Sequence, residues 1–352
     1  MIRFPFAMTR KQWIRILLVL SLTALLLFLF VRQINWSEAF GYLKSVRWGV
    51  FALVLLLTPL HMITRALRWK YLMVHEKRDI GFYNMFAANA VGFTATYLFP
   101  GRIGELIKPL YLAKKENCRP GFAIGTVVVE RIFDVFTMCA LLGIFLLARP
   151  LYASIFNIQT DSMKSLTLFG ILGMAFASVL LAVCLGFYFF RDKALKIAGA
   201  ILGIKIIPER FRAKILELLH EFIDGLKFFH SPGNLLTYIL LSFAVWLGII
   251  FYYWVFFLAF NIRLNFFFLI PYVFLTAVGA SIPTPGMVGG YHAFSQMGLT
   301  GLFRMDPNQA GGLTVVMHAV QFAGTCLVGF LVLWKDGLSL FQLKRLGKGE
   351  NP

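Results

Sequence analysis

Apolar residues in this chain gather into long segments that are separated by short polar connections. The segments cover approximately residues 16–31, 49–64, 81–99, 122–148, 166–190, 235–260, 264–282 and 310–334. Segments of this length and composition are typical of helices that lie within a lipid bilayer. The pattern therefore predicts an all-α membrane protein with about eight hydrophobic segments.

Basic residues in the connections predict the orientation of the chain, because cytoplasmic loops are enriched in Lys and Arg. Segments 65–78 and 191–214, the N-terminus and the C-terminal tail are basic and are expected on the cytoplasmic side; Arg65 and Arg68 belong to the first of them. The chain is also basic near residue 115, so residues 81–113 must enter and leave on the cytoplasmic side. By the same reasoning, residues 264–305 must enter and leave on the opposite side.

A Pro-Gly break interrupts each of these two excursions. Pro100-Gly101-x-x-Gly104 in the first matches Pro285-Gly286-x-x-Gly289 in the second, at a constant offset of 185 positions. Paired, interrupted hydrophobic segments of opposite orientation are typical of inverted-repeat transporters with a site near the membrane midplane. We therefore expect two oppositely oriented re-entrant hairpins within one polytopic domain, residues 1–335.

Two shorter regions complete the predicted organisation. Residues 205–230 repeat apolar positions at helical spacing, with charged residues on the other face. They predict a cytoplasmic amphipathic connector helix, which either packs on the ends of the spans or lies on anionic lipid. Residues 336–352 are expected to form a basic cytoplasmic tail.

The composition supports the membrane assignment and restricts the partners. The chain has 352 residues, of which 59% are hydrophobic and 14% are charged, and a soluble domain cannot cover so much apolar surface. A net charge of +18 would suggest nucleic acid in a soluble protein. Here the basic residues lie between apolar segments, which predicts contact with anionic lipid and no nucleic-acid partner.

Charged residues also occur inside the apolar segments, in two stretches. "PGRIGELIKP" (100–109) and "VVVERIFDVF" (127–136) together supply Arg102, Glu105, Lys108, Glu130, Arg131 and Asp134. Six lipid-facing charges would cost about 15–20 kcal/mol, which exceeds the roughly 5–15 kcal/mol that stabilises a typical domain. The six charges must therefore face inward. Their sum is zero, which predicts ion pairs between the two stretches.

This cluster has two interpretations. It is either an ion-pair lock that fixes the first hairpin or a substrate-binding site, because Arg and Lys bind phosphate and a broken helix offers free N–H groups to an anion. A phospholipid or a polyprenyl-phosphate lipid would be the substrate. Tyr291 and His292, after the second break, are further candidate substrate-binding residues. His318 is equally compatible with a hydrogen bond between helices.

Recognisable catalytic motifs are missing from the chain. It has no phosphate-binding loop, no H-E-x-x-H, no G-x-S-x-G and no Cys/His zinc spacing, so neither a cofactor nor a metal is expected. Two alternatives to transport stay open. One is an intramembrane lipid-modifying enzyme that uses His292 with Asp134 or Glu130 as acid and base. The other is a scaffold that moves no lipid and holds a partner glycosyltransferase.

The order of "NAVGFTATYLFPGRIGELIKPLYL", "TVVVERIFD" and "SIPTPGMVGGYHAF" resembles the flippase-like membrane domain of bacterial lysylphosphatidylglycerol synthases, including its stand-alone relatives. The resemblance covers roughly residues 10 to 335. It implies a helical inner-membrane protein with re-entrant segments that transfers a charged phospholipid between leaflets.

Two departures from the family's pattern change what the resemblance implies. Many members carry a glutamate after the second break, where this chain has Tyr291-His292, and this leaves the identity of the lipid open. The soluble aminoacyl transferase domain is also missing. A lipid-synthesising partner enzyme is therefore expected to supply any modified lipid, and the oligomeric state stays open.

Overall fold

The computed structural model describes residues 46–73, 77–148, 163–202 and 232–338, together with single positions between 209 and 223. Within these residues the chain is helical and contains no strand, which confirms the all-α prediction. The first apolar segment, residues 16–31, lies outside the described residues. So do most of the predicted connector, residues 205–230, and the tail beyond residue 338.

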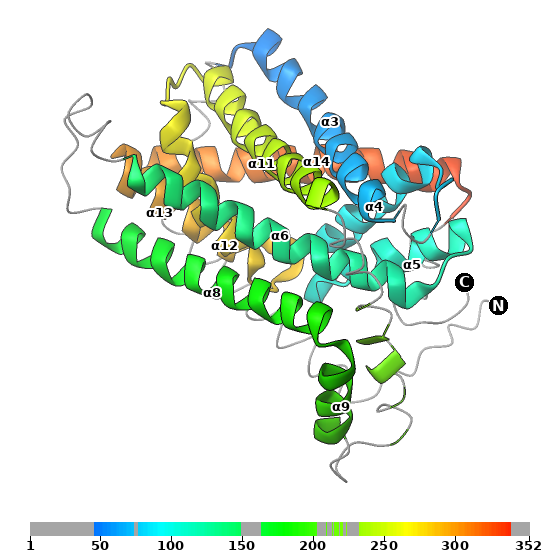
Figure 1. Cartoon of the computed structure of the whole chain (residues 1–352). Helices are drawn as coiled ribbons and strands as arrows, with labels where there is room; N and C mark the ends of the chain where they lie inside the picture. Colours follow the sequence, from blue (N-terminus) through cyan, green and yellow to red (C-terminus); the bar gives the residue numbers. More distant parts are fainter. Residues whose placement is uncertain are drawn as a thin grey trace, which may run out of the picture.

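The described helices include one at each predicted apolar segment between residues 49 and 334. They are α3 (Trp48–Met73), α4 (Phe82–Leu98), α5 (Gly104–Glu116), α6 (Pro120–Leu147), α8 (Met163–Phe189), α9 (Arg191–Leu202), α11 (Pro232–Ala259), α12 (Leu269–Ser281), α13 (Gly290–Phe303) and α14 (Pro307–Lys335). Among the described helices, α3, α11 and α14 are long and apolar enough to cross a membrane. The chain is therefore a multi-pass membrane protein. Figure 1 shows α3 beside α11 and α6 beside α8.

Two helical hairpins stand at the predicted Pro-Gly breaks. Helices α4 and α5 pack against each other around the short turn η1 (Pro100–Arg102), and α12 and α13 do so around η4 (Pro285–Met287). Gly101 and Gly286 have φ angles of 75° and 61°, in the left-handed region that side chains other than glycine adopt at a cost. The residues after them, Arg102 and Met287, also have positive φ. The same backbone turn therefore occurs twice, 185 positions apart.

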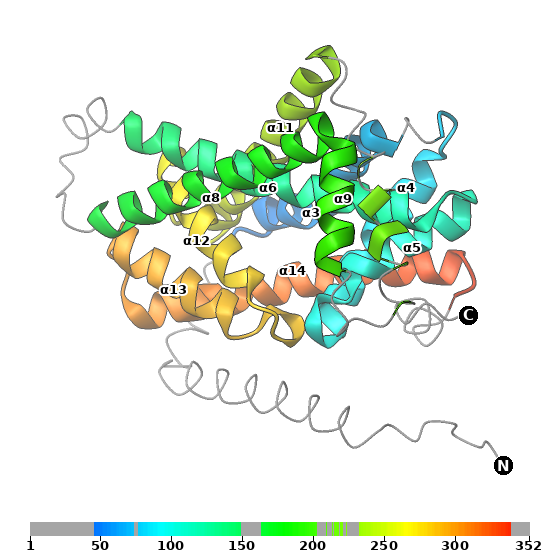
Figure 2. The same cartoon turned by 60° about the horizontal axis from the view of Figure 1, so that its bottom comes forward.

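The hairpins approach each other from opposite ends of α14. The side chain of Thr94 on α4 donates to the carbonyl of Thr325 in the C-terminal half of α14, at 3.1 Å. Ser295 on α13 contacts Thr314 in the N-terminal half, with 2.8 Å between their hydroxyl oxygens. Figure 2 shows α12 and α13 at one end of α14 and α4 and α5 at the other. The two tips, η1 and η4, meet between them.

Two hydrophobic cores correspond to the two hairpins. The first surrounds α4 and α5 and includes Trp69 and Tyr111, whereas the second surrounds α12 and the end of α11 and includes Phe256 and Tyr272. Helices α6 and α14 contribute buried residues to both cores. The charged residues and a cavity lie between the two cores, where the tips of the hairpins meet.

Candidate functional site

A cavity of about 680 Å³ lies beside the meeting point of the two hairpin tips. Helices α3, α4, α5, α6, α8, α11, α12, α13 and α14 all contribute to its wall. The wall combines charged side chains with aromatic and apolar ones. The charged residues that line it are Arg65, Arg102, Glu105, Arg131 and Asp134.

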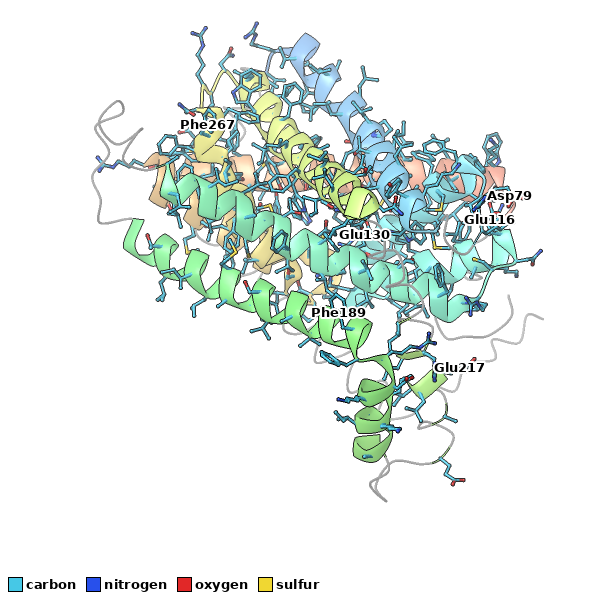
Figure 3. All side chains as sticks on the ribbon, viewed as in Figure 1. Asp79, Glu116, Glu130, Phe189, Glu217 and Phe267 are labelled. Atoms are coloured by element: carbon cyan, nitrogen blue, oxygen red, sulfur yellow. The ribbon has the colours of Figure 1, made fainter. Side chains whose placement is uncertain are left out.

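Two carboxylates on α6 form the centre of the charged cluster. Glu130 and Asp134 stand one helical turn apart, and both are buried. Figure 3 shows Glu130 in the interior of the molecule, far from Phe267 at one end and Glu116 at the other. The fully buried guanidinium of Arg68 bridges them, with Nη2 2.9 Å from Glu130 Oε1 and Nη1 2.7 Å from Asp134 Oδ1. This bridge relieves the repulsion that the i, i+4 spacing creates.

Further cations surround the same carboxylates. Arg65 Nη1 lies 3.6 Å from Asp134 Oδ2, and Arg131 Nη1 lies 3.2 Å from that oxygen. Lys108 from α5 donates to Glu130, and its ammonium group lies over the ring of Trp69. Each carboxylate therefore contacts cations from at least two helices.

Both sequence stretches that carry buried charge meet in this cluster. Glu105 Oε2 lies 3.6 Å from Arg131 Nε, and Lys108 contacts Glu130. Arg102, at the tip of the first hairpin, lies 3.6 Å from Glu105 and lines the cavity. "PGRIGELIKP" thus supplies partners for "ERIFD", as the charge balance predicts.

The structure corrects the predicted location of Arg65 and Arg68. The basic content of residues 65–78 predicted a cytoplasmic segment, but α3 continues to Met73 and buries both arginines. The helical spacing of the residues before and after Arg65 could have predicted this continuation. Val54, Thr58 and Arg65 fall on the buried face of one continuous helix.

The six charges predicted to face inward do sum to zero, but the cluster contains two further cations. With the two α3 arginines, five cations face three carboxylates in the described part of the chain, so the sum is +2 and not zero. The cations are Arg65, Arg68, Arg102, Lys108 and Arg131, and the carboxylates are Glu105, Glu130 and Asp134.

The second hairpin places Tyr291 in the cavity wall and His292 at the start of α13. Tyr291 lines the cavity, and its hydroxyl oxygen lies 3.3 Å from that of Tyr253. His292 is buried, and its Nδ1 accepts from the N–H of Gly289 at 3.3 Å, which caps the start of α13. The rings of Tyr291 and His292 both contact the ring of His318.

Charged contacts outside the membrane-spanning segments anchor the open end of the first hairpin. Glu116 accepts from Lys77 Nζ at 2.8 Å, from Asn84 Nδ2 at 2.7 Å and from the N–H of Gly81 at 2.9 Å. Burial alone would raise the pKa of Glu116, but these hydrogen bonds outweigh it and lower the pKa below the ordinary value of 4.5. Asp336, just after α14, lies 2.9 Å from Lys115.

The chain is similar to a known family and to a known protein. The family model described as "Lysylphosphatidylglycerol synthase TM region" matches residues 12–329. The chain is similar to UPF0104 membrane protein MJ1595 of Methanocaldococcus jannaschii, with 22% identity over 295 residues, which cover 80% of this chain and 83% of that protein. No solved structure matches the chain.

Proposed function

Because the chain belongs to the family of lysylphosphatidylglycerol synthase transmembrane regions, we propose that it moves a phospholipid or a polyprenyl-phosphate lipid between the two leaflets of its membrane. The observation that carries this proposal is the excess of positive charge at the cavity. Three carboxylates leave two of five cations uncompensated in the described part of the chain. A lipid phosphate would supply the missing negative charge, and guanidinium groups suit it because they bind phosphate with two parallel hydrogen bonds.

The apolar part of the cavity suits the rest of such a lipid. Phe176 on α8 and Val278 on α12 line the cavity and are exposed, by 57% and 39%. The volume of about 680 Å³ lies in the range of sites for drug-sized ligands. A headgroup would occupy the cavity, and its acyl chains would extend past Phe176 and Val278 into the bilayer.

The two hairpins provide a means to open the cavity to each side. Their tips meet beside it and reach it from opposite ends of α14. Displacement of one tip would open the cavity toward one leaflet and displacement of the other toward the opposite leaflet. This is the alternating access that inverted-repeat transporters use. The Pro-Gly turns are the expected hinges.

The proposal also covers the location of the protein and the source of its substrate. The expected location is a bacterial inner membrane, with both chain termini in the cytoplasm, and a separate lipid-synthesising enzyme supplies the substrate. The chain itself changes the leaflet of the lipid and leaves its covalent structure unchanged. It is therefore expected not to be an enzyme.

The direct test is leaflet exchange of fluorescent phosphatidylglycerol in vesicles that contain the purified protein. Exchange should exceed that of protein-free vesicles, and the mass of the lipid should not change. A change in mass would instead support a lipid-modifying enzyme. Absence of exchange by a folded protein would contradict the proposal and leave the scaffold function.

Arg102→Lys tests the charged wall because it keeps the charge but loses the two-pronged hydrogen bond to phosphate. Exchange should fall about tenfold, which corresponds to about 1.4 kcal/mol, while the melting temperature in detergent stays nearly unchanged. Arg263→Lys is the matched control, since Arg263 is exposed in the loop before α12. Equal loss of stability and exchange in Arg102→Lys would support the ion-pair lock. Full exchange would remove Arg102 from the site.

A further inference from the structure

A histidine in the cavity wall holds one of the arginines beside it. His61 stands one helical turn before Arg65 on α3, and both residues line the cavity. The Nε2 atom of His61 accepts a hydrogen bond from Arg65 Nε at 2.9 Å. Since arginine keeps its protons, this bond requires a neutral imidazole that carries its own proton on Nδ1. Within the described residues it is the one hydrogen bond of the His61 ring.

The two arginines of α3 are held in different ways. Arg68 is fully buried away from the cavity and donates to Glu130 and Asp134 at 2.9 and 2.7 Å. Arg65 lines the cavity, and its contact with Asp134 Oδ2 is 3.6 Å long, which is too far for a hydrogen bond. In the described part of the chain, the hydrogen bond that Arg65 donates is the one to His61. Arg68 is thus a fixed member of the ion-pair cluster, whereas a neutral side chain holds Arg65.

The ring of Phe93 on α4 lies against the same guanidinium group. Arg65 Cζ lies 5.3 Å from the centre of this ring, within the range of a cation–π contact. Phe93 also lines the cavity. The face of an aromatic ring attracts a cation but does not direct its hydrogen bonds, so it allows the guanidinium group to turn. The orientation of Arg65 therefore depends on His61.

A neutral acceptor suits an arginine that has to exchange its partner. In an interior of low dielectric constant the attraction between a guanidinium group and a carboxylate is large, and an entering phosphate would have to compete with it. The lone pair of His61 lacks this attraction between full charges. Arg65 can therefore exchange His61 for a phosphate oxygen more easily than Arg68 can leave Glu130 and Asp134.

We infer that His61 is a positioning residue, which holds Arg65 at the cavity wall until a lipid phosphate replaces the imidazole as its acceptor. This inference rests on the proposed function, since it names the arginine that recognises the phosphate of the transported lipid. No proton is transferred in the exchange: Arg65 keeps its charge, and its Nε–H changes acceptor from His61 Nε2 to a phosphate oxygen. The new bond adds the attraction of opposite charges.

Three substitutions at His61 separate the presence of an acceptor from its charge. His61→Gln keeps a neutral acceptor, His61→Leu removes it, and His61→Glu replaces it with a carboxylate. Exchange of phosphatidylglycerol should be nearly retained in the first variant and should fall about tenfold in the other two. The melting temperature in detergent should fall in His61→Leu and rise in His61→Glu, which adds a carboxylate to a cluster with excess positive charge. A purely structural role predicts instead that exchange follows stability in all three.

His220 provides the matched control, because it also contacts an arginine but is exposed and lies outside the cavity wall. Its Nδ1 lies 3.5 Å from Arg191 Nη2. His220→Gln and His220→Leu should both leave exchange unchanged. Full exchange by a folded His61→Leu protein would overturn the inference and leave the proposed function intact. Equal losses in His61→Gln and His61→Leu would also overturn it, since glutamine keeps the acceptor.

A double substitution tests whether His61 acts through Arg65. Arg65→Met alone should slow exchange about tenfold, and the further change His61→Leu should add little, because the side chain that His61 orients is already absent. Arg65→Met leaves four cations for three carboxylates in the cluster, so the protein is expected to fold. Losses that multiply in the double variant would show that His61 acts independently of Arg65 and would overturn the inference.

A binding measurement separates this inference from the transport proposal. Dihexanoyl phosphatidylglycerol should raise the melting temperature of the detergent-purified protein, and His61→Leu should need about tenfold more of it for half of the shift. His61→Gln should need no more than the original protein. This binding pattern without exchange would support the inference and contradict the proposed function. Equal stabilisation by free glycerol 3-phosphate and by dihexanoyl phosphatidylglycerol would indicate a soluble ligand and overturn the lipid assignment.

Discussion

The two hairpins have the same backbone turn, but the first carries charged side chains and the second does not. The first carries Arg102, Glu105 and Lys108 after its Pro-Gly break. At the same offset of 185 positions the second has Met287, Gly290 and Ala293, and residues 264–303 contain no charged side chain. The repeat therefore duplicates the geometry of a broken helix pair without duplicating its electrostatics.

The difference in chemistry determines how each hairpin is held in place. Ion pairs tie the first hairpin to α6, through Lys108 with Glu130 and Glu105 with Arg131. The second is held by neutral hydrogen bonds, from Tyr272 to Ser295 and on to Thr314. Arg102 and Glu105 of the first hairpin and Tyr291 of the second thus line the same cavity.

The largest effect on stability is expected at Arg68, because its guanidinium group contacts both Glu130 and Asp134. Arg68→Met would leave Glu130 and Asp134 with weaker compensation in the interior, and breaking a buried ion pair typically costs about 3–5 kcal/mol. Folded yield and melting temperature in detergent should both fall sharply. Addition of Glu130→Gln should restore part of the loss. A stable Arg68→Met single variant would show that the charged region does not depend on this bridge.

Alanine at the two turn glycines tests whether the tips meet. A left-handed conformation at a residue other than glycine costs about 1–3 kcal/mol, so Gly101→Ala and Gly286→Ala should both destabilise the protein. A Cβ at Gly286 would lie 3.3 Å from the carbonyl oxygen of Tyr97, whereas one at Gly101 would meet open space. Gly286→Ala should therefore lower the melting temperature more. Equal effects would argue against close contact between the tips.

At the N-terminal end of α14, near the second hairpin, the side chain of Asp306 caps the helix. Its side chain accepts from the N–H groups of Asn308 and Gln309, as a helix N-cap does. Asp306→Ala should cost about 1 kcal/mol, and Asp306→Ser should recover most of it because serine also caps helices. The measurement is the melting temperature of the three proteins. No recovery with serine would indicate that the charge of Asp306, and not its cap, is what matters.

The smallest effect on stability is expected at Glu116. Its hydrogen bonds join the end of α5 to the start of α4, at the end of the first hairpin away from the turn. Its pKa is lowered in the folded protein, so its contribution to stability is complete above pH 4.5 and disappears as the pH falls through the lowered value. Glu116→Gln should lower the melting temperature modestly at pH 7, and the difference from the original protein should shrink below pH 4.5. A difference that is independent of pH would contradict an ionic contribution.

Much of the fold follows from local patterns in the sequence. Apolar length predicts several helices to within a few residues, as at α6, where residues 122–148 were expected and Pro120–Leu147 is found. The Pro-Gly breaks predict both turns, because only a few residues adopt the left-handed conformation readily. The cost of charge in an apolar medium predicts that Glu130 and Asp134 face inward.

The composition of the site depends on contacts that local patterns do not specify. Arg68 and Glu130 are 62 positions apart, and their pairing depends on how α3 packs against α6. A basic run after an apolar one usually indicates a membrane boundary, so the continued helix to Met73 was not expected. The meeting of Tyr252 and Thr58 at the cavity likewise depends on the packing of α11 against α3.

The sequence by itself therefore determined an all-α membrane protein, two broken hairpins and an inward-facing group of charges. These features depend on the chemistry of single residues or on spacing within one segment. Only the tertiary structure decided that the charges sum to +2, that His292 caps α13 and that tyrosines from α4, α11 and α13 complete the cavity wall. The reason is physical: net charge and hydrogen-bond satisfaction in a membrane interior are properties of helices packed together, and no single segment contains them.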